Sequence, residues 1–335
     1  MKTRSLTEGA ILGALTVLLT LLGEYLGLPA VIVPVPLILM VYRQGFRWGV
    51  ITAFVAALIT GLAAGHVFAG LSIIIWGFVG VALGMALRER FSFVKLMATG
   101  VFANLVVIGL NALLYALIIG GNQYRELMNV LLESIEQAMA TARGLGVPEE
   151  ALGNYQMMQQ LVPFIFQNAL PAILFLSSLG MSFVHLAVAR LVLKRMGDVV
   201  PWAKPFSQWR LPGYCAIFLV FGWVVTQLAL FFELPRWLEF VGVNVFYITS
   251  AAYLVTGLSL AWYYFNQRKT PTFLRILFVF LLYAIPLALI ALILLTIVDG
   301  FVDLRRLLDA KAEVVRAEDQ DLDAVAEAER DHAED

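Results

Sequence analysis

The chain has 335 residues, of which 61% are hydrophobic and 14% are charged, with 23 Lys or Arg against 24 Asp or Glu. A soluble domain carries about 25% charged residues, and a mean hydropathy of +0.85 excludes a soluble globular protein. The single cysteine, Cys215, excludes an internal disulfide and a cysteine-based metal site.

Nine apolar segments approach the length of about 20 residues that a helix needs to cross a bilayer. They predict an all-α polytopic transmembrane bundle with about nine spans, within a range of 8–10. The segments are 6–27, 29–43, 47–69, 71–88, 96–119, 161–193, 212–232, 240–265 and 272–298. The second is short and contains Pro29, Pro34 and Pro36, which favours a broken or tilted helix. Pro286 makes the ninth either one kinked helix or a re-entrant pair.

The basic residues predict the orientation of the bundle. They cluster at 2–4, 43–47, 88–95, 190–210 and 268–275. All these connections are cytoplasmic if the N-terminus is inside, so we expect a multi-pass protein of a bacterial cytoplasmic cell membrane with a cytoplasmic N-terminus. Nine single crossings would place Arg305, Arg306 and Lys311 outside. Either the ninth segment is a hairpin, or the rule fails there.

Three parts are predicted along the chain. Residues 1–195 form a membrane core of six helices, 196–300 add further transmembrane helices, and 301–335 form an acidic tail that is disordered or a solvated helix. Within the core, 120–160 is a long external connection whose apolar residues recur at helical spacing, which predicts an amphipathic helix. This helix either rests on the bilayer or the bundle, or it forms a lid over an external site.

Several motifs that carry chemistry are missing from the sequence. There is no Gly-rich loop ending in Gly-Lys-Ser/Thr, no His-Glu-x-x-His zinc motif and no nucleophile elbow around a serine. No soluble segment interleaves basic and aromatic residues as nucleic-acid-binding surfaces do. We therefore expect no enzyme activity, no cofactor, no metal site and no nucleic-acid partner, and we expect contact with membrane lipid.

Polar groups within apolar spans are costly, at about 3 kcal/mol for a charged side chain at the helix centre on insertion scales. With the orientation above, seven such groups lie at the external ends of their helices. The candidate substrate-binding residues are Glu24, Tyr25, His66, Asn111, Tyr115, Gln167 and Asn168. Either they converge on a polar pocket open to the outside, or each is an interfacial cap or an interhelical hydrogen bond. His185, towards the cytoplasmic end, is expected to be structural.

The first helix carries small residues four apart, in the pairs Gly9/Gly13 and Ala10/Ala14. Small residues permit close approach of helix backbones in lipid. This face therefore predicts either tight packing within the bundle or docking of a separate membrane partner.

An Ala-x-x-x-Ala first helix, the segment 34–39 (PVPLIL) and the segment 43–49 (RQGFRWG) together resemble the substrate-binding S components of energy-coupling factor (ECF) transporters, over roughly residues 5–195. Over nearly the full length, the chain also resembles the YybS-like family of uncharacterised bacterial membrane proteins, which the stretch 299–305 fits. The first resemblance implies binding of a vitamin or metal ion outside. It also implies docking through Ala10 and Ala14 onto a transmembrane coupling subunit driven by two ATPases. The second resemblance implies no function.

The leading hypothesis is small-solute binding or uptake, energised by partner subunits. The alternative is a non-transporting scaffold for cell-envelope or morphogenesis proteins, because an S component has no need of the segments after 195. A third hypothesis is an enzyme acting on lipid-linked substrates.

Overall fold

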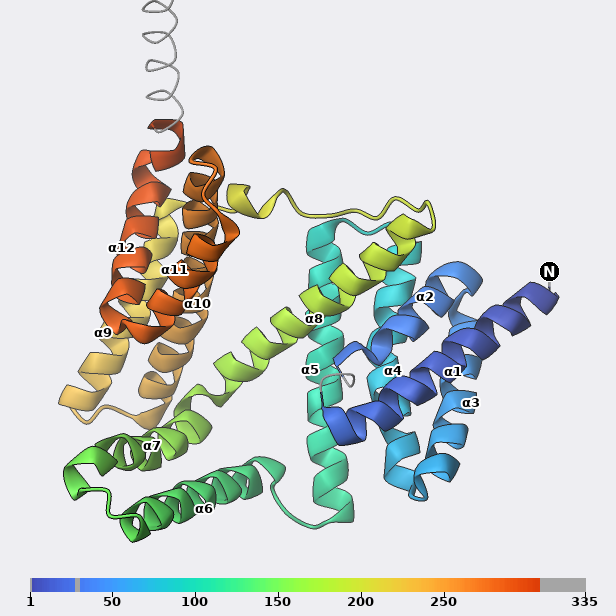
Figure 1. Ribbon diagram of the computed structural model, residues 1–335, viewed down its shortest axis with the longest axis horizontal. Helices are drawn as coiled ribbons and strands as arrows, with labels where there is room; N and C mark the ends of the chain where they lie inside the picture. Colours follow the sequence, from blue (N-terminus) through green and yellow to red (C-terminus); the bar gives the residue numbers. More distant parts are fainter. Residues whose placement is uncertain (1, 28–30, 308–335) are drawn as a thin grey trace, which may run out of the picture. The chain divides into compact units, whose positions relative to one another are not determined.

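The computed structural model describes residues 2–27 and 31–307, and all regular elements in this range are helices (Figure 1). The chain divides into two compact units, Met1–Ala203 and Lys204–Asp335, called unit 1 and unit 2 below. The predicted core ended at 195. The predicted acidic tail lies outside the described residues from 308 onwards.

Seven described helices are long and apolar enough to cross a membrane, or eight spans if one bent helix pair is counted as a span. This agrees with a polytopic helical membrane bundle. The expected nine spans included the segment 29–43, but the helix found there is not among the helices long enough to cross a membrane. The helix found there, α2 (Pro34–Gln44), has 11 residues, which rise only about 16 Å against a hydrocarbon core of about 30 Å.

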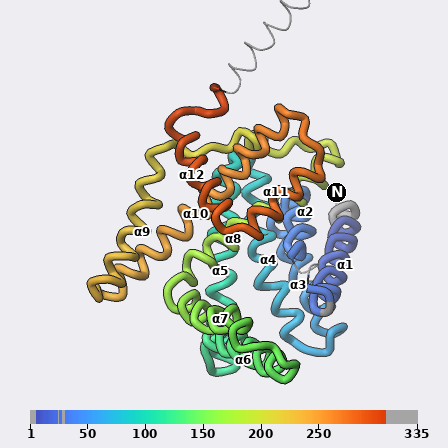
Figure 2. The backbone as a smooth tube through the Cα atoms, turned by 60° about the vertical axis from the view of Figure 1, so that its left-hand side comes forward, coloured from blue at the N-terminus to red at the C-terminus, as the bar shows by residue number. Residues whose placement is uncertain are grey.

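Unit 1 builds a layered bundle around α2 (Figure 2). Its first helices are α1 (Lys2–Leu26), α2, α3 (Phe46–Ala64), α4 (Val67–Arg88) and α5 (Phe93–Ile118). Pro34 stands in the first turn of α2, where its missing N–H costs no hydrogen bond, and the side chains from Pro34 to Val41 are all buried. The proline-rich segment is thus an enclosed core helix with α1, α3, α4 and α8 (Leu170–Arg195) around it.

Glycines allow this enclosure. A Cβ at Gly84 of α4 would lie 2.6 Å from the Cβ of Val41 and 2.8 Å from the carbonyl oxygen of Ile38. At Gly80, one turn earlier, it would lie 2.9 Å from the carbonyl oxygen of Pro34. The backbones of α2 and α4 therefore meet along a glycine face, as small residues allow in lipid.

The predicted amphipathic helix is present as α6 (Gln123–Gly144). Its first turn is capped by Asn122, whose side-chain oxygen accepts from the backbone N–H groups of Tyr124 and Arg125. Gly146, with a φ of +80°, follows its end and reverses the chain, because glycine adopts this left-handed conformation without strain.

The helical stretch that contains the predicted sixth span begins before residue 161. It consists of α7 (Gly153–Phe164), a π-helical turn Ile165–Ala169 and α8. Pro171 lacks an N–H and its ring displaces the carbonyl four residues before it, which explains the wide turn at this position. In Figure 1 the resulting long element runs diagonally past α5.

Unit 2 consists of α9 (Ala216–Phe231), α10 (Arg236–Gln267), α11 (Thr272–Ala284) and α12 (Pro286–Val302). The backbones of α9 and α10 meet at Gly222 and Gly242, where an added Cβ would lie within 3 Å of main-chain nitrogen on the other helix. The last two helices are bent by 108° at their junction. Because Arg305 contacts the backbone carbonyl of Ser207, the chain returns after α12 to the end of the unit where α9 begins. This path of the chain agrees with the alternative prediction that the segment 272–298 is a re-entrant pair. It brings Arg305 to the same end of the unit as Arg210, and the basic-residue rule expects basic residues to share one side of the membrane.

Substitution of Gly84 by Ala tests the glycine face. We expect Gly84→Ala to lower the free energy of unfolding by about 1–3 kcal/mol, because the added methyl overpacks the contact with α2. Unfolding of the purified protein by sodium dodecyl sulfate, followed by circular dichroism, measures the change. Gly180→Ala in α8 is the matched control, because a Cβ there meets nothing within 4 Å. Equal stability of the two variants would contradict the packing described.

Candidate functional site

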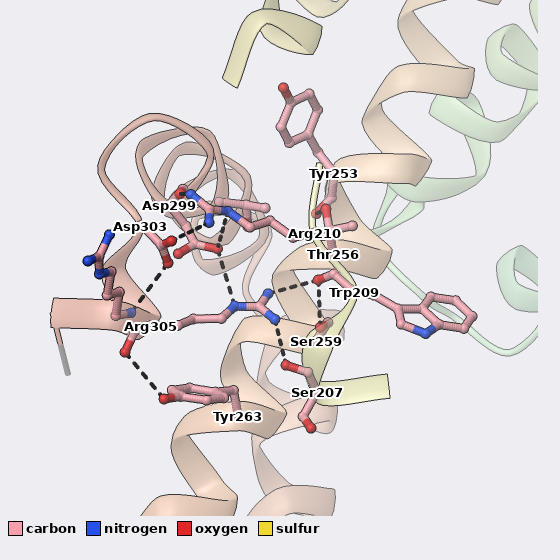
Figure 3. A network of polar contacts seen from close by, with 12 residues as sticks. Ser207, Trp209, Arg210, Tyr253, Thr256, Ser259, Tyr263, Asp299, Asp303 and Arg305 are labelled. Atoms are coloured by element: carbon pink, nitrogen blue, oxygen red, sulfur yellow. Dashed lines mark hydrogen bonds and ion pairs between the residues drawn. The ribbon is translucent and has the colours of Figure 1, made fainter. Parts of the chain in front are cut away.

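The most extensive polar network of the described chain lies in unit 2 and contains two arginines and two aspartates (Figure 3). Asp299 is in the last turn of α12, and Asp303 and Arg305 follow it. Arg210 precedes α9. Its Nη1 lies 2.7 Å from Asp303 Oδ2, and its Nε lies 3.9 Å from Asp299 Oδ2. Arg305 Nε lies 3.4 Å from the same Asp299 oxygen. The four charges balance within the cluster.

Backbone carbonyl groups of the segment before α9 complete the network. Arg305 donates from Nη1 to the carbonyl of Ser207, at 2.5 Å, and from Nη2 to that of Trp209, at 2.8 Å. Ser259 of α10 donates to the carbonyls of Phe206 and Trp209, at 2.6 and 2.8 Å. The non-helical segment is therefore tied to α10 and to the end of α12.

Burial makes the network sensitive to the loss of one partner. The side chain of Asp299 is 1% exposed and that of Arg305 is 10% exposed. Neither carboxylate oxygen of Asp299 accepts a hydrogen bond from the described residues, so the nearby guanidinium groups compensate its charge. Removing one member of a buried pair leaves an uncompensated charge and costs about 3–5 kcal/mol.

Asp303 lies at the surface of the network. Its left-handed backbone, with a φ of +58°, ends α12. Partial burial opposes ionisation of its carboxyl group, but the hydrogen bond from Arg210 and that from the backbone N–H of Arg306 outweigh it and lower its pKa. Asp303 is therefore held in its charged form, which keeps its pairing with Arg210 intact.

In unit 1, two of the predicted substrate-binding residues meet. His66 Nε2 lies 3.7 Å from Glu24 Oε1, at the end of α1. His66 caps the start of α4, where its Nδ1 accepts from the backbone N–H of Ala69 at 3.2 Å. This assigns the ring proton to Nε2, on the side facing Glu24. His66 also lines a cavity of about 460 Å³ between α3 and α4, with Phe54, Leu58, Gly61, Gly70 and Ile74 among the other lining residues.

The other predicted residues make different contacts. Tyr115 donates to the carboxylate of Glu126 on α6, and Asn111 donates to the carbonyl of Val107 in its own helix. Gln167 and Asn168 lie in the π-helical turn before α8. The side chain of Tyr25 is outside the described residues. The described contacts thus join Glu24 to His66, and Tyr115 to α6.

The four small residues of α1 divide into two pairs. Gly9 and Gly13 face Thr52 of α3. A Cβ added at either glycine would lie 3.3 Å from a side-chain atom of Thr52. Ala10 and Ala14 stay exposed. All four line a groove of about 490 Å³ between α1 and α3. The glycines thus serve packing within the bundle, and the alanines remain on the surface.

Sequence reasoning did not predict two groups of polar contacts that the structure contains. The Asp299–Arg305 network was noted only as a stretch typical of a family, although a carboxylate at the end of an apolar span is itself a signal. In unit 1, Asn104 of α5 donates to Ser182 of α8, at 3.1 Å, and both are buried. His185 lies one turn after Ser182 on α8. Its Nε2 is 2.8 Å from the carbonyl oxygen of Val31, which is a structural contact.

Comparisons with known proteins identify relatives of the chain. Residues 10–300 match the model of a family described as a predicted membrane protein, DUF2232. A protein of Bacillus subtilis strain 168, "Uncharacterized protein YybS", is 23% identical over 309 residues, which cover 90% of this chain and 97% of that protein. No solved structure matches. The family expected from the stretch 299–305 is thus supported, and the resemblance to S components is not supported by these matches.

Arg305→Met tests the network in unit 2. We expect the free energy of unfolding to fall by about 3–5 kcal/mol, because Asp299 is left buried without its nearest countercharge. The Asp299→Leu/Arg305→Met double variant should recover part of the loss. Arg306→Met is the matched control, since Arg306 is exposed. Thermal unfolding of the purified variants measures the effect, and equal loss in the Arg305 and Arg306 variants would refute it.

Proposed function

Given that the chain belongs to the DUF2232 family of predicted membrane proteins, we propose that unit 1 binds a small solute as the first step of uptake. The binding groups are Glu24 and His66, and the solute carries a cationic or hydrogen-bond-donating group. The S-component resemblance implies the same activity and the same side of the membrane, the outside.

The observation that carries the proposal is the meeting of Glu24 and His66, which are 42 positions apart, beside a cavity lined by His66. Their 3.7 Å separation is longer than a hydrogen bond. The carboxylate therefore keeps acceptor capacity for a ligand. A cavity of about 460 Å³ falls within the usual range for small-molecule sites, roughly 300–1,000 Å³.

The distribution of charge supports the orientation that uptake requires. Glu8, near the start of α1, pairs with Arg43 at 2.9 Å, and Arg43 also contacts Met196, beyond the end of α8. Basic residues thus gather at the end of unit 1 opposite Glu24. Since basic ends tend to face the cytoplasm, the proposal takes the Glu24 end as external and the N-terminus as cytoplasmic.

The sequence has no nucleotide-binding motif with which this chain could itself use ATP to drive uptake. The proposal therefore includes a membrane partner, a coupling subunit with ATPases, docked along Ala10 and Ala14. Their exposure and the groove between α1 and α3 support this docking.

A second candidate is the scaffold for cell-envelope or morphogenesis proteins. The observation that favours it is unit 2, which has its own packed helices and its own ion network. A solute-binding core has no need of such a unit, whereas a scaffold needs surface for partners.

Ligand binding tests the first proposal. We expect at least one member of a panel of cationic water-soluble vitamins and amines to raise the thermal midpoint of the purified protein. Glu24→Gln and His66→Gln should each weaken that binding at least tenfold, because a hydrogen bond to a charged group contributes about 1.5–3 kcal/mol. Glu133→Gln, on the exposed face of α6, is the control. No binding by the wild type, or unchanged binding by both variants, would disprove the proposal.

Co-purification separates the two candidates. The tagged protein is isolated from its host in mild detergent, and its partners are identified by mass spectrometry. For uptake, we expect coupling and ATPase subunits in defined ratio, lost in the Ala10→Trp/Ala14→Trp variant because the bulky rings block close helix approach. Leu22→Trp, at another exposed site of α1, should retain them. Envelope-assembly proteins bound equally by both variants would favour the scaffold instead.

A further inference from the structure

Unit 2 contains an apolar cavity of about 730 Å³ that the proposed uptake function does not use. It lies between α10, α11 and α12 and is lined by Leu260, Tyr264, Phe265, Leu282, Ala288, Ala291, Leu295 and Leu307, among others. None of the described residues that line it is charged. The lining excludes a polar solute, because burying polar groups without hydrogen-bond partners is unfavourable.

The cavity is elongated along α12. Its lining includes Ala288, near the start of that helix, and Leu304, just beyond its end. The helix between Ala288 and Val302 rises about 21 Å, which exceeds half of a hydrocarbon core of about 30 Å. The space therefore has the length of a lipid chain in one leaflet.

Exposed apolar side chains surround it. On α11, Phe273 is 71% exposed and Phe280 is 63% exposed, and on α12 Leu294 is 58% exposed. In a membrane protein such a surface faces lipid. An acyl chain from the surrounding bilayer can therefore reach the cavity without crossing a polar layer.

The basic residues at one end of the cavity supply the second, independent observation. Arg305 and Arg275 are occupied, since they donate to backbone carbonyl groups of Trp209 and Thr270, respectively. Arg268 lies over the ring of Tyr264, a lining residue, with its Cζ 5.6 Å from the ring centroid. Lys269 is next to it and exposed. Of the ion pairs described in unit 2, none uses Arg268 or Lys269.

We propose that unit 2 binds an anionic glycerophospholipid, with an acyl chain in this cavity and the phosphate at Arg268 and Lys269. Basic pockets between transmembrane helices bind anionic headgroups in this way. Arg268 and Lys269, which form no ion pair with the described residues, are complementary in charge to the phosphate, and the position of Arg268 on Tyr264 joins the two halves of the site.

Native mass spectrometry of the full-length protein in non-ionic detergent tests the proposal, with dioleoyl phosphatidylglycerol and dioleoyl phosphatidylcholine as probes. We expect the first phosphatidylglycerol to bind at least tenfold more tightly than the first phosphatidylcholine. Arg268→Gln/Lys269→Gln should abolish this preference. Ala291→Trp, which fills the cavity from an exposed position, should weaken first-site binding of both lipids at least tenfold.

Two matched controls keep the result specific. Ala284→Trp adds the same ring on α11 outside the cavity lining, and Arg236→Gln removes a charge at the opposite end of α10. Both should bind lipid as the wild type does. Equal affinity for the two lipids in the wild type, or no effect of Ala291→Trp, would overturn the proposal. A variant truncated after Leu307 gives a further test. If only this variant binds lipid, the proposal is overturned, and residues 308–335 would be the occupant of the cavity in the full-length protein.

Discussion

In the bilayer there is no water to hydrogen-bond backbone N–H and C=O groups, so each of them must find a partner within the protein. This requirement explains much of the structure. An interruption of a helix frees carbonyl groups, and at three places in this chain a side chain from a distant position contacts them. Arg305 and Ser259 serve the segment before α9. Arg88 reaches back from the end of α4 towards the carbonyls of Val41 and Tyr42, at 3.5 and 3.4 Å. His185 serves the carbonyl of Val31, before α2.

This constraint also separates structural polar residues from candidate binding residues. His185 and Arg305 are buried and contact freed backbone carbonyl groups, His185 through Nε2 and Arg305 through Nη1 and Nη2. Glu24 and His66 differ, because the carboxylate faces another ionisable side chain at a distance longer than a hydrogen bond. The sequence alone does not separate these cases, since a histidine in an apolar segment looks the same in both.

The sequence predicted the helical class, most helix positions and the amphipathic α6, because these follow from hydrophobic length and periodicity, which are local properties. It did not predict that α2 is enclosed, because that depends on Gly80 and Gly84 being opposite Leu37 and Val41 in space. For the same reason it placed seven polar groups at the external ends of their helices without showing which of them meet. Contacts such as Tyr115 with Glu126 depend on helix rotation and on the path of α6, which periodicity does not determine.

Basic residues at the end of unit 2 show how one statistical signal covers several physical roles. The basic-residue rule counts Arg210, Arg268, Arg275 and Arg305 alike. In the structure, Arg305 and Arg275 donate to freed carbonyls, and Arg210 compensates the carboxylates of α12. Once these are assigned, Arg268 and Lys269 remain as cations near the apolar cavity that form no ion pair with the residues that the structure describes. The same accounting of backbone groups that explains the fold therefore also separates the arginines that serve the fold from Arg268, for which no such contact to a backbone carbonyl is described.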